Sequence, residues 1–275
     1  MRLLKRYFSM SKYKALFLVW CLSSGAVIAA DTDTIRLTSG EWPPYLSEHL
    51  PSYGFASHVV SEAFAAMGVQ VEYSFFPWGR ALYNAGKISN RDDERWHGSI
   101  VWLKTAPREK RFVYSDRVVL EPQAIFFLKG TDTDLPAEEY LSGRRVGVTY
   151  HAEHPVLDEM ERKGLITLER IGNYEMLFKR LLLGRVDAVV VEQQVGRFYL
   201  NSSLKKTERE RITRLKSHLG DRDFHLILNR HWGNAERYIE IFNQGLKALK
   251  DDGRYAQYMD QLNEGYYDRV NRQSP

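Results

Sequence analysis

"YEMLFKRLLLGRVDAVVVE", residues 174–192, joins a helical pattern to a strand pattern. Apolar residues recur at helical spacing as far as Gly184, and the residues after Asp187 are apolar and β-branched. A helix that leads into a short apolar strand is the repeating unit of α/β proteins. The stretch therefore predicts the α/β class.

The same alternation extends along the chain from residue 31 onward. Strand patterns fall at residues 34–39, 69–76, 98–102, 123–129, 144–150, 165–170, 187–192 and 224–229. Helical patterns fall at residues 57–68, 78–87, 155–163, 174–184 and 235–253, with a last helix expected after Gly253. Such alternation favours an α/β architecture with largely parallel sheets.

Two of these helices have clear apolar faces. In the first, the expected buried residues are Val59, Val60, Ala63, Phe64 and Met67. In the penultimate one they are Ile239, Phe242, Leu246 and Leu249.

The units fall into two sets, and a trailing strand with its helices is expected to return to the first set. The chain would then cross between two lobes twice, at residues 118–124 and 220–226, and two crossovers form a hinge that suits closure around a ligand. We expect residues 31–120 and 225–275 to form lobe 1, and residues 121–224 to form lobe 2.

The first thirty residues have the composition of a secretory signal peptide. Residues 15–30 are an apolar run that ends in small residues, and five basic residues precede it: Arg2, Lys5, Arg6, Lys12 and Lys14. We expect cleavage after Ala29 or Ala30, and in a bacterium this export leads to the periplasm. The alternative is a retained membrane anchor, but a spanning helix needs about 20 apolar residues and this run is shorter.

Removal of this leader changes the charge of the chain. It takes away five of 39 basic residues and leaves 34 against 35 acidic ones, a formal charge of −1. The composition therefore gives no argument for nucleic acid as a partner. The single cysteine, Cys21, lies within the leader, so no disulfide is expected in the remaining chain.

Common cofactor and catalytic motifs are absent from the sequence. There is no Walker loop, no GxGxxG and no GxSxG, and we expect no cofactor. The best metal candidate is "HAEHP", with His151, Glu153 and His154, but it lacks the i, i+4 histidine pair of zinc helices. Because Pro155 suits the first position of a helix, we expect a polar loop at a helix N-terminus, which can receive an anionic group.

Five segments, in their order, resemble the family 3 extracellular solute-binding proteins, the periplasmic receptors of polar amino-acid ABC importers. They are "SGEWPPY" (39–45), "GF" (54–55), "KTAPREKRFVYSD" (104–116), "RRVGVTY" (144–150) and "LLLGRVDAVVVEQ" (181–193). The resemblance runs from Ile35 to Tyr267. It implies a two-lobed type II periplasmic binding protein fold with two hinge crossings and a ligand cleft between the lobes. It also implies a small polar, amino-acid-like ligand, a permease in the inner membrane and a monomeric protein.

The resemblance also assigns roles to individual residues. Arg108 matches the arginine that grips the ligand carboxylate, for which a guanidinium offers two charge-assisted bonds. Glu192 matches the acceptor of the ligand amine, and Trp42 matches the aromatic ring against the ligand side chain, with Glu41 at the rim. The alternatives are a solvated cation for Arg108 and a helix-start carboxylate for Glu192.

The segments also depart from the family pattern. "IVWLKT" places Trp102, expected as an apolar wall, where small hydroxyl residues are usual, and "YHAEH" replaces a small loop with Tyr150, His151 and Glu153. Tyr45 is expected to bind the ligand together with Trp42, and the alternative is that Trp42 and Tyr45 both cap the core of the lobe beside the Pro-Pro turn. Acidic residues at positions 41, 153 and 192 would suit a ligand with extra positive charge.

The leading hypothesis is a periplasmic solute-binding protein that captures its ligand by lobe closure and delivers it to an ABC importer. One alternative is an enzyme on the same scaffold that resembles the cyclohexadienyl (prephenate/arogenate) dehydratases, with Glu153 or Glu192 as general acid. Another is a sensory receptor that presents its closed form to a membrane kinase. Turnover separates the first two, because a receptor returns its ligand unchanged.

Overall fold

The computed structural model describes residues 33–88, 96–130, 134–150 and 152–269. The chain divides into two units, Met1–Thr32 and Asp33–Pro275, and the expected leader lies outside the described residues. Within the described part, no helix combines the length and the apolar composition that a membrane span requires. The following description concerns the second unit.

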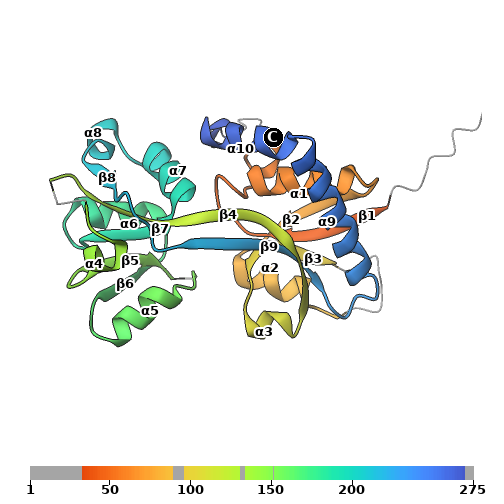
Figure 1. Ribbon diagram of the computed structural model, residues 1–275, viewed down its shortest axis with the longest axis horizontal. Helices are drawn as coiled ribbons and strands as arrows, with labels where there is room; N and C mark the ends of the chain where they lie inside the picture. The colour runs from red at the N-terminus through yellow and green to blue at the C-terminus, as the bar shows by residue number, and fades with distance from the viewer. Residues whose placement is uncertain (1–32, 89–95, 131–133, 151, 270–275) are drawn as a thin grey trace, which may run out of the picture. The chain divides into compact units, whose positions relative to one another are not determined.

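Nine strands are present in the described residues. They are β1 (Thr34–Ser39), β2 (Gln70–Phe75), β3 (Gly98–Leu103), β4 (Phe112–Leu128), β5 (Arg145–Thr149), β6 (Thr167–Ile171), β7 (Ala188–Glu192), β8 (Ile212–Arg214) and β9 (Asp221–Asn229). The strand order is β2-β1-β3-β9-β4-β7-β5-β6, with β8 beside β4 (Figure 1). The α/β prediction is confirmed.

The helices form two groups along the chain. The first comprises η1 (Pro51–Tyr53), α1 (Phe55–Ala65), α2 (Trp78–Ala85), α3 (Ala106–Glu109), α9 (Ala235–Asp251), α10 (Arg254–Asn263) and η3 (Tyr266–Asp268). The second comprises α4 (Ala137–Leu141), α5 (Pro155–Arg162), α6 (Tyr174–Leu182), α7 (Gln193–Ser203) and α8 (Lys206–Arg209). We call the first group with β1–β3 the first lobe, and the second group with β5–β8 the second lobe.

Strand β4 belongs to both lobes. It pairs with β9 from Phe112 to Pro122 and then with β7 from Gln123 to Phe126. β9 runs beside it in the opposite direction, so two adjacent strands connect the lobes (Figure 1). The expected two-lobed fold with two crossings is confirmed, while the exact lobe boundaries at 120/121 and 224/225 stay a prediction.

The sheets are mixed and not largely parallel as predicted. β1 pairs in parallel with β2 and β3, and β5 with β6 and β7, as expected of strands joined through helices. The pairs that involve β4 or β9 are antiparallel. The two crossover strands therefore account for the antiparallel part of the sheets.

The apolar helix faces form the core of the first lobe. Phe64 of α1 packs against Phe242 of α9 with ring centroids 5.2 Å apart, and the four expected apolar residues of α9 are all buried. The prediction for α1 is wrong only at Met67, which is exposed. The helix ends at Ala65, so Met67 lies in the following turn and leaves the apolar face.

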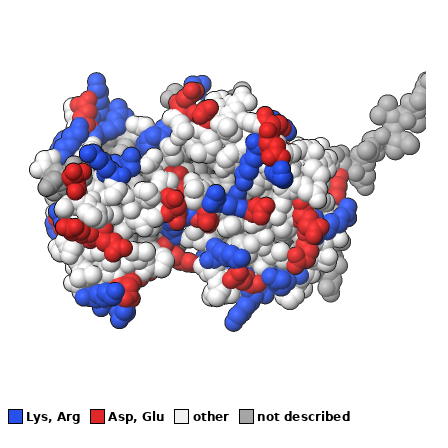
Figure 2. All heavy atoms as spheres, viewed as in Figure 1, with Lys and Arg blue, Asp and Glu red and all other residues white. Residues whose placement is uncertain are grey.

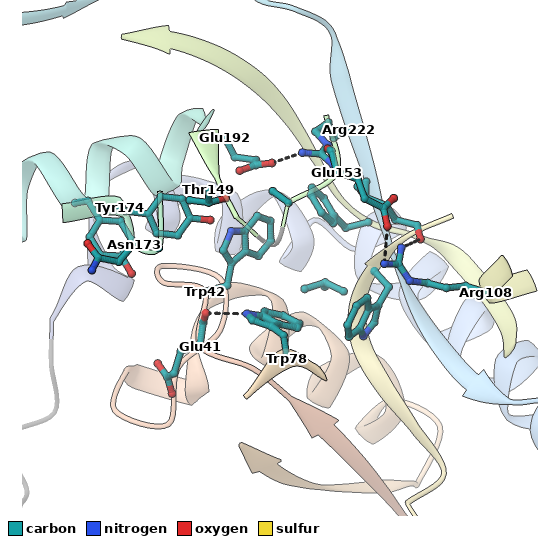
Figure 3. Close-up of a pocket in the computed structure, with 17 residues that line it drawn as sticks. Glu41, Trp42, Trp78, Arg108, Thr149, Glu153, Asn173, Tyr174, Glu192 and Arg222 are labelled. Atoms are coloured by element: carbon teal, nitrogen blue, oxygen red, sulfur yellow. Dashed lines mark hydrogen bonds and ion pairs between the residues drawn. The ribbon is translucent and has the colours of Figure 1, made fainter. Parts of the chain in front are cut away.

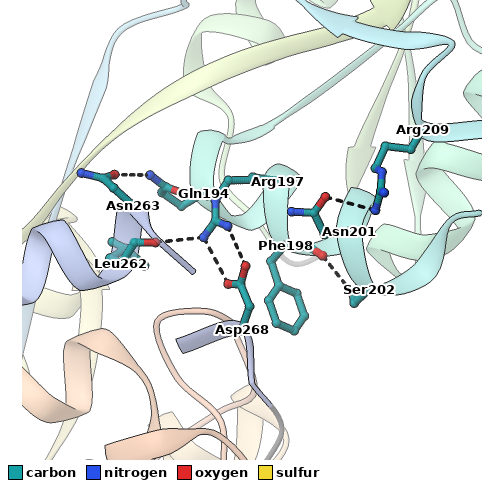
Figure 4. A network of polar contacts seen from close by, with 9 residues as sticks. All are labelled: Gln194, Arg197, Phe198, Asn201, Ser202, Arg209, Leu262, Asn263 and Asp268. Atoms are coloured by element: carbon teal, nitrogen blue, oxygen red, sulfur yellow. Dashed lines mark hydrogen bonds and ion pairs between the residues drawn. The ribbon is translucent and has the colours of Figure 1, made fainter. Parts of the chain in front are cut away.

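Besides the crossover strands, polar contacts at α7 connect the two lobes (Figure 4). Arg197 of α7 donates two hydrogen bonds to the Asp268 carboxylate, at 2.6 and 3.1 Å, and one to the carbonyl oxygen of Leu262. Gln194 of the same helix donates to the Asn263 side chain at 2.8 Å. The second lobe is therefore bound to the C-terminal segment of the first lobe as well as to its crossover strands.

Charged side chains of both signs are interspersed over the face shown in Figure 2. Many form exposed pairs within one element, such as Glu175 with Lys179 at 2.5 Å and Glu159 with Arg162 at 2.6 Å. Exposed pairs of this kind contribute little to stability, typically below about 1 kcal/mol.

Candidate functional site

A cavity of about 290 Å³ is bounded by side chains from both lobes (Figure 3). The first lobe contributes Glu41, Trp42, Trp78, Trp102 and Arg108. The second lobe contributes Thr149, Glu153, Asn173, Tyr174, Glu192 and Tyr199. Strand β9 adds Arg222 and Phe224.

The sheet topology explains why these residues meet. Trp42 follows the carboxyl end of β1, and Trp102 lies near the end of β3. In the other lobe, Thr149 ends β5 and Glu192 ends β7. Ligands of open α/β sheets bind beyond the carboxyl ends of the strands, and here those ends from both lobes border one cavity.

Arg108 forms an ion pair across the cavity. One terminal nitrogen lies 2.8 Å from a Glu153 carboxylate oxygen, and the other donates to the carbonyl oxygen of Leu103 at 3.1 Å. Its guanidinium also lies 4.9 Å from the Trp102 ring centre, within the range of a cation–π contact. Arg108 is therefore no freely solvated cation, and its position is held by both lobes.

Glu192 is held by Arg222, which the sequence analysis did not select. Arg222 Nη1 lies 2.8 Å from Glu192 Oε1, and Nη2 donates to the carbonyl oxygen of Glu153 at 2.7 Å. Both side chains are buried, with 9% and 3% of Arg222 and Glu192 exposed. Glu192 also stands at the N-cap of α7, as the helix-start alternative predicted, but its side chain makes no capping bond there.

Six of the nine residues named from the sequence line this cavity: Glu41, Trp42, Trp102, Arg108, Glu153 and Glu192. Tyr45 does not reach it, because it is fully buried and stacks beneath Trp42 at 4.6 Å. Tyr150 is 64% exposed and does not line the cavity. His151 lies outside the described residues.

The sequence analysis missed several rings and one arginine of the lining. Trp78 lies in a helix that the sequence predicts, but only the structure shows that it packs against Gly40, where a Cβ would overlap its ring. Tyr174 and Tyr199 stack on each other at 4.7 Å from neighbouring helices. Arg222 lies in the predicted crossing at residues 220–226, and the pairing of this segment with β4 brings its side chain beside Glu192.

A second buried carboxylate lies beside the ion pair. Glu121 of β4 is 4% exposed, pairs in register with Arg222 across the crossover strands and accepts a hydrogen bond from the Gln194 N–H at 2.6 Å. Burial raises the pKa of Glu121 to about 7, although contacts with the Tyr45 hydroxyl and the Gln194 N–H oppose the rise. Glu121 therefore titrates near neutral pH at the point where β4 changes lobes.

Of the metal candidate of the sequence, the structure describes Glu153 and His154, while His151 lies outside the described residues. His154 is buried at the N-cap of α5 and its Nδ1 lies 3.1 Å from the Gln123 side-chain nitrogen. Burial, and then the nearby Arg222 charge, lower the pKa of His154 to about 4. Among the residues that the structure describes, no cluster of three His, Cys, Asp or Glu side chains offers a metal site.

Solved structures similar to this chain share its architecture. The probable amino-acid ABC transporter extracellular-binding protein from Bacillus subtilis matches with a TM-score of 0.68 at 18% identity, over 84% of this chain and 97% of its own. An ancestral arginine-binding protein bound to arginine matches with a TM-score of 0.64 at 20% identity, over 83% and 97%. The fold is that of the type II periplasmic binding proteins.

A sensor domain is also similar to this chain in fold. A histidine kinase sensor domain with similarity to periplasmic binding proteins matches with a TM-score of 0.64 at 16% identity, over 84% of this chain and 97% of its own. The sequence matches no protein-family model and no curated protein. At these identities the likeness concerns the fold, and the ligand must be argued from the cavity.

The pKa of Glu121 predicts how pH affects stability. Because its folded pKa of about 7 lies above the ordinary value of 4.5, its favourable contribution is complete below pH 4.5 and is lost as pH rises through 7. Glu121→Gln keeps a hydrogen-bond acceptor without the charge. We expect the variant to gain roughly 3 kcal/mol relative to the parent between pH 4 and pH 8, measured by urea unfolding. Parallel pH profiles would contradict this.

The buried pair of Arg222 and Glu192 predicts strong coupling. Arg222→Met should cost roughly 3 to 5 kcal/mol of unfolding free energy, because it leaves the Glu192 carboxylate buried and unpaired. Adding Glu192→Gln should restore part of this loss, which a double-mutant cycle measures. The exposed pair of Arg117 and Asp223, at 3.0 Å, provides the control, with an expected coupling below about 1 kcal/mol. Equal coupling in both pairs would refute the prediction.

Proposed function

We propose that this protein is a periplasmic solute-binding protein that captures a small amino-acid-like ligand by lobe closure and hands it to an ABC importer. The observation that carries the proposal is a cavity lined by residues of both lobes. Two adjacent crossover strands connect these lobes. A ligand in such a position stabilises the closed form by contacting both lobes at once. The similar structure of a probable amino-acid ABC transporter extracellular-binding protein supports the proposal through its shared fold.

In this proposal Arg108 binds the ligand carboxylate. Glu153 occupies the same guanidinium at 2.8 Å, so an incoming carboxylate takes the place of the Glu153 side chain. Glu192 faces the cavity but accepts from Arg222, so a ligand amine would share it with that arginine. The two carboxylates that the sequence offers to a dehydratase are thus both engaged by arginines, which favours a binding role.

The proposal is tested by a thermal-shift screen. The protein without residues 1–30 is denatured, freed of carried-over ligand and refolded, and then mixed with amino acids, polyamines, opine-like compounds and prephenate. A ligand that binds only the folded state raises the melting temperature with its saturation. We expect a shift with one compound class and recovery of that compound unchanged. Conversion of the bound compound would favour the enzyme instead.

The proposed role of Arg108 predicts opposite effects on ligand affinity for substitutions of the two partners of its ion pair, Arg108 and Glu153. Arg108→Ala should weaken a carboxylate ligand by roughly 2 to 5 kcal/mol, measured by calorimetry. Glu153→Gln removes the competing carboxylate and should tighten the same ligand. Arg117→Ala changes an exposed arginine outside the cavity and should have no effect. Unchanged affinity in the Arg108 variant would sink the assignment.

A further inference from the structure

The charges that face the cavity are already paired inside the protein. Arg108 binds Glu153 and Arg222 binds Glu192, each with nitrogen and oxygen 2.8 Å apart. Glu41 accepts a hydrogen bond from the backbone N–H of Glu48 at 3.0 Å. A ligand recognised mainly by its charges would have to displace several of these contacts.

The remaining lining is dominated by aromatic rings. Trp42, Trp102 and Phe224 are buried, whereas Trp78, Tyr174 and Tyr199 are partly exposed. These last three come from different helices and from both lobes.

The indole N–H groups of Trp78 and Trp102 are hydrogen-bonded within the protein. The indole N–H of Trp78 donates to the carbonyl oxygen of Glu41 at 3.3 Å, and that of Trp102 donates to the Ser99 hydroxyl at 2.9 Å. With their donors engaged in the protein, these side chains offer the ligand their apolar ring surfaces. Asn173 is engaged as well, since its side-chain oxygen caps α6 through the Met176 N–H at 2.8 Å.

From this arrangement we infer that the ligand carries an aromatic ring or a comparable flat apolar group. The inference rests on the proposed binding function and names the ligand class of the same cavity. The ring lies among the cavity rings of both lobes, Trp42 and Trp78 of the first and Tyr174 of the second (Figure 3), and its polar end points to Arg108. Rings attract one another in stacked and edge-to-face arrangements beyond the area they bury.

The size of the cavity agrees with this ligand class. An apolar cavity of about 150 Å³ holds benzene, and this cavity has a volume of about 290 Å³. One six-membered ring with a short polar tail fills such a space. Closure of the lobes around it would bring rings of both lobes against the two faces of the ligand.

The test uses pairs of compounds that share a polar end and differ in the ring. L-Phenylalanine is compared with L-glutamine, phenylacetate with acetate, and phenethylamine with ethylamine, each by calorimetry on the stripped and refolded protein. We expect the aromatic member of at least one pair to bind at least tenfold more tightly. Tighter binding of the non-aromatic members, or no binding in any pair, would overturn the ligand class.

Variants then locate the ring. Trp78→Leu and Tyr174→Leu should each weaken the tightest aromatic probe by roughly twofold to tenfold, the effect of one aromatic contact. Tyr83→Leu provides a matched control, because Tyr83 lies on the same helix as Trp78, is 65% exposed and lies outside the cavity. Circular dichroism and melting temperature confirm that each variant is folded. An unchanged affinity in both cavity variants would refute the inference.

Two outcomes separate this inference from the proposed function. A non-aromatic compound that binds tightly and is recovered unchanged would refute the ligand class and leave the receptor intact. An aromatic compound that binds and is recovered converted would support the ligand class and refute the receptor.

Discussion

The buried ion pair of Arg222 and Glu192 is the interaction on which the rest of the site depends. It joins a crossover strand to the end of β7, and the same arginine donates to the backbone of Glu153. Since Glu153 in turn holds Arg108, the four charges form one connected arrangement that spans both lobes. A buried charge is tolerated only with a partner, so loss of one member disturbs the others.

This arrangement changes what a ligand meets in the cavity. A cavity that binds a charged ligand directly would contain unpaired charged side chains. Here the charged side chains pair with one another, and aromatic rings form much of the remaining lining. In the proposed receptor, the rings would select the ligand by shape, and the exchange of Glu153 for a ligand carboxylate at Arg108 would select it by charge. That exchange would contribute only the difference in free energy between the new ion pair and the Arg108–Glu153 pair that it replaces.

Local patterns predicted much of the fold, and contacts between distant segments account for the rest. The helix from Ala235 and the strand that ends at Glu192 follow from periodicity within their own residues. Strand β4 could not be predicted as one element, because Pro122 lacks a donor and disfavours strands, and only pairing with β9 extends it. Likewise Arg222 gains its importance from a partner thirty positions away, which no local pattern reveals.

The polar network between α7 and the C-terminal segment bears on how this protein is labelled. Chain ends are the usual points for attaching tags and dyes, because they rarely contribute to the fold. The segment at Asp268 is not suited to this use, because Asp268 pairs with Arg197 on the helix that Glu192 begins, and a bulky group attached at Asp268 would disrupt a contact between lobes. The exposed surface of α2 around Tyr83 offers an attachment site that leaves the network untouched.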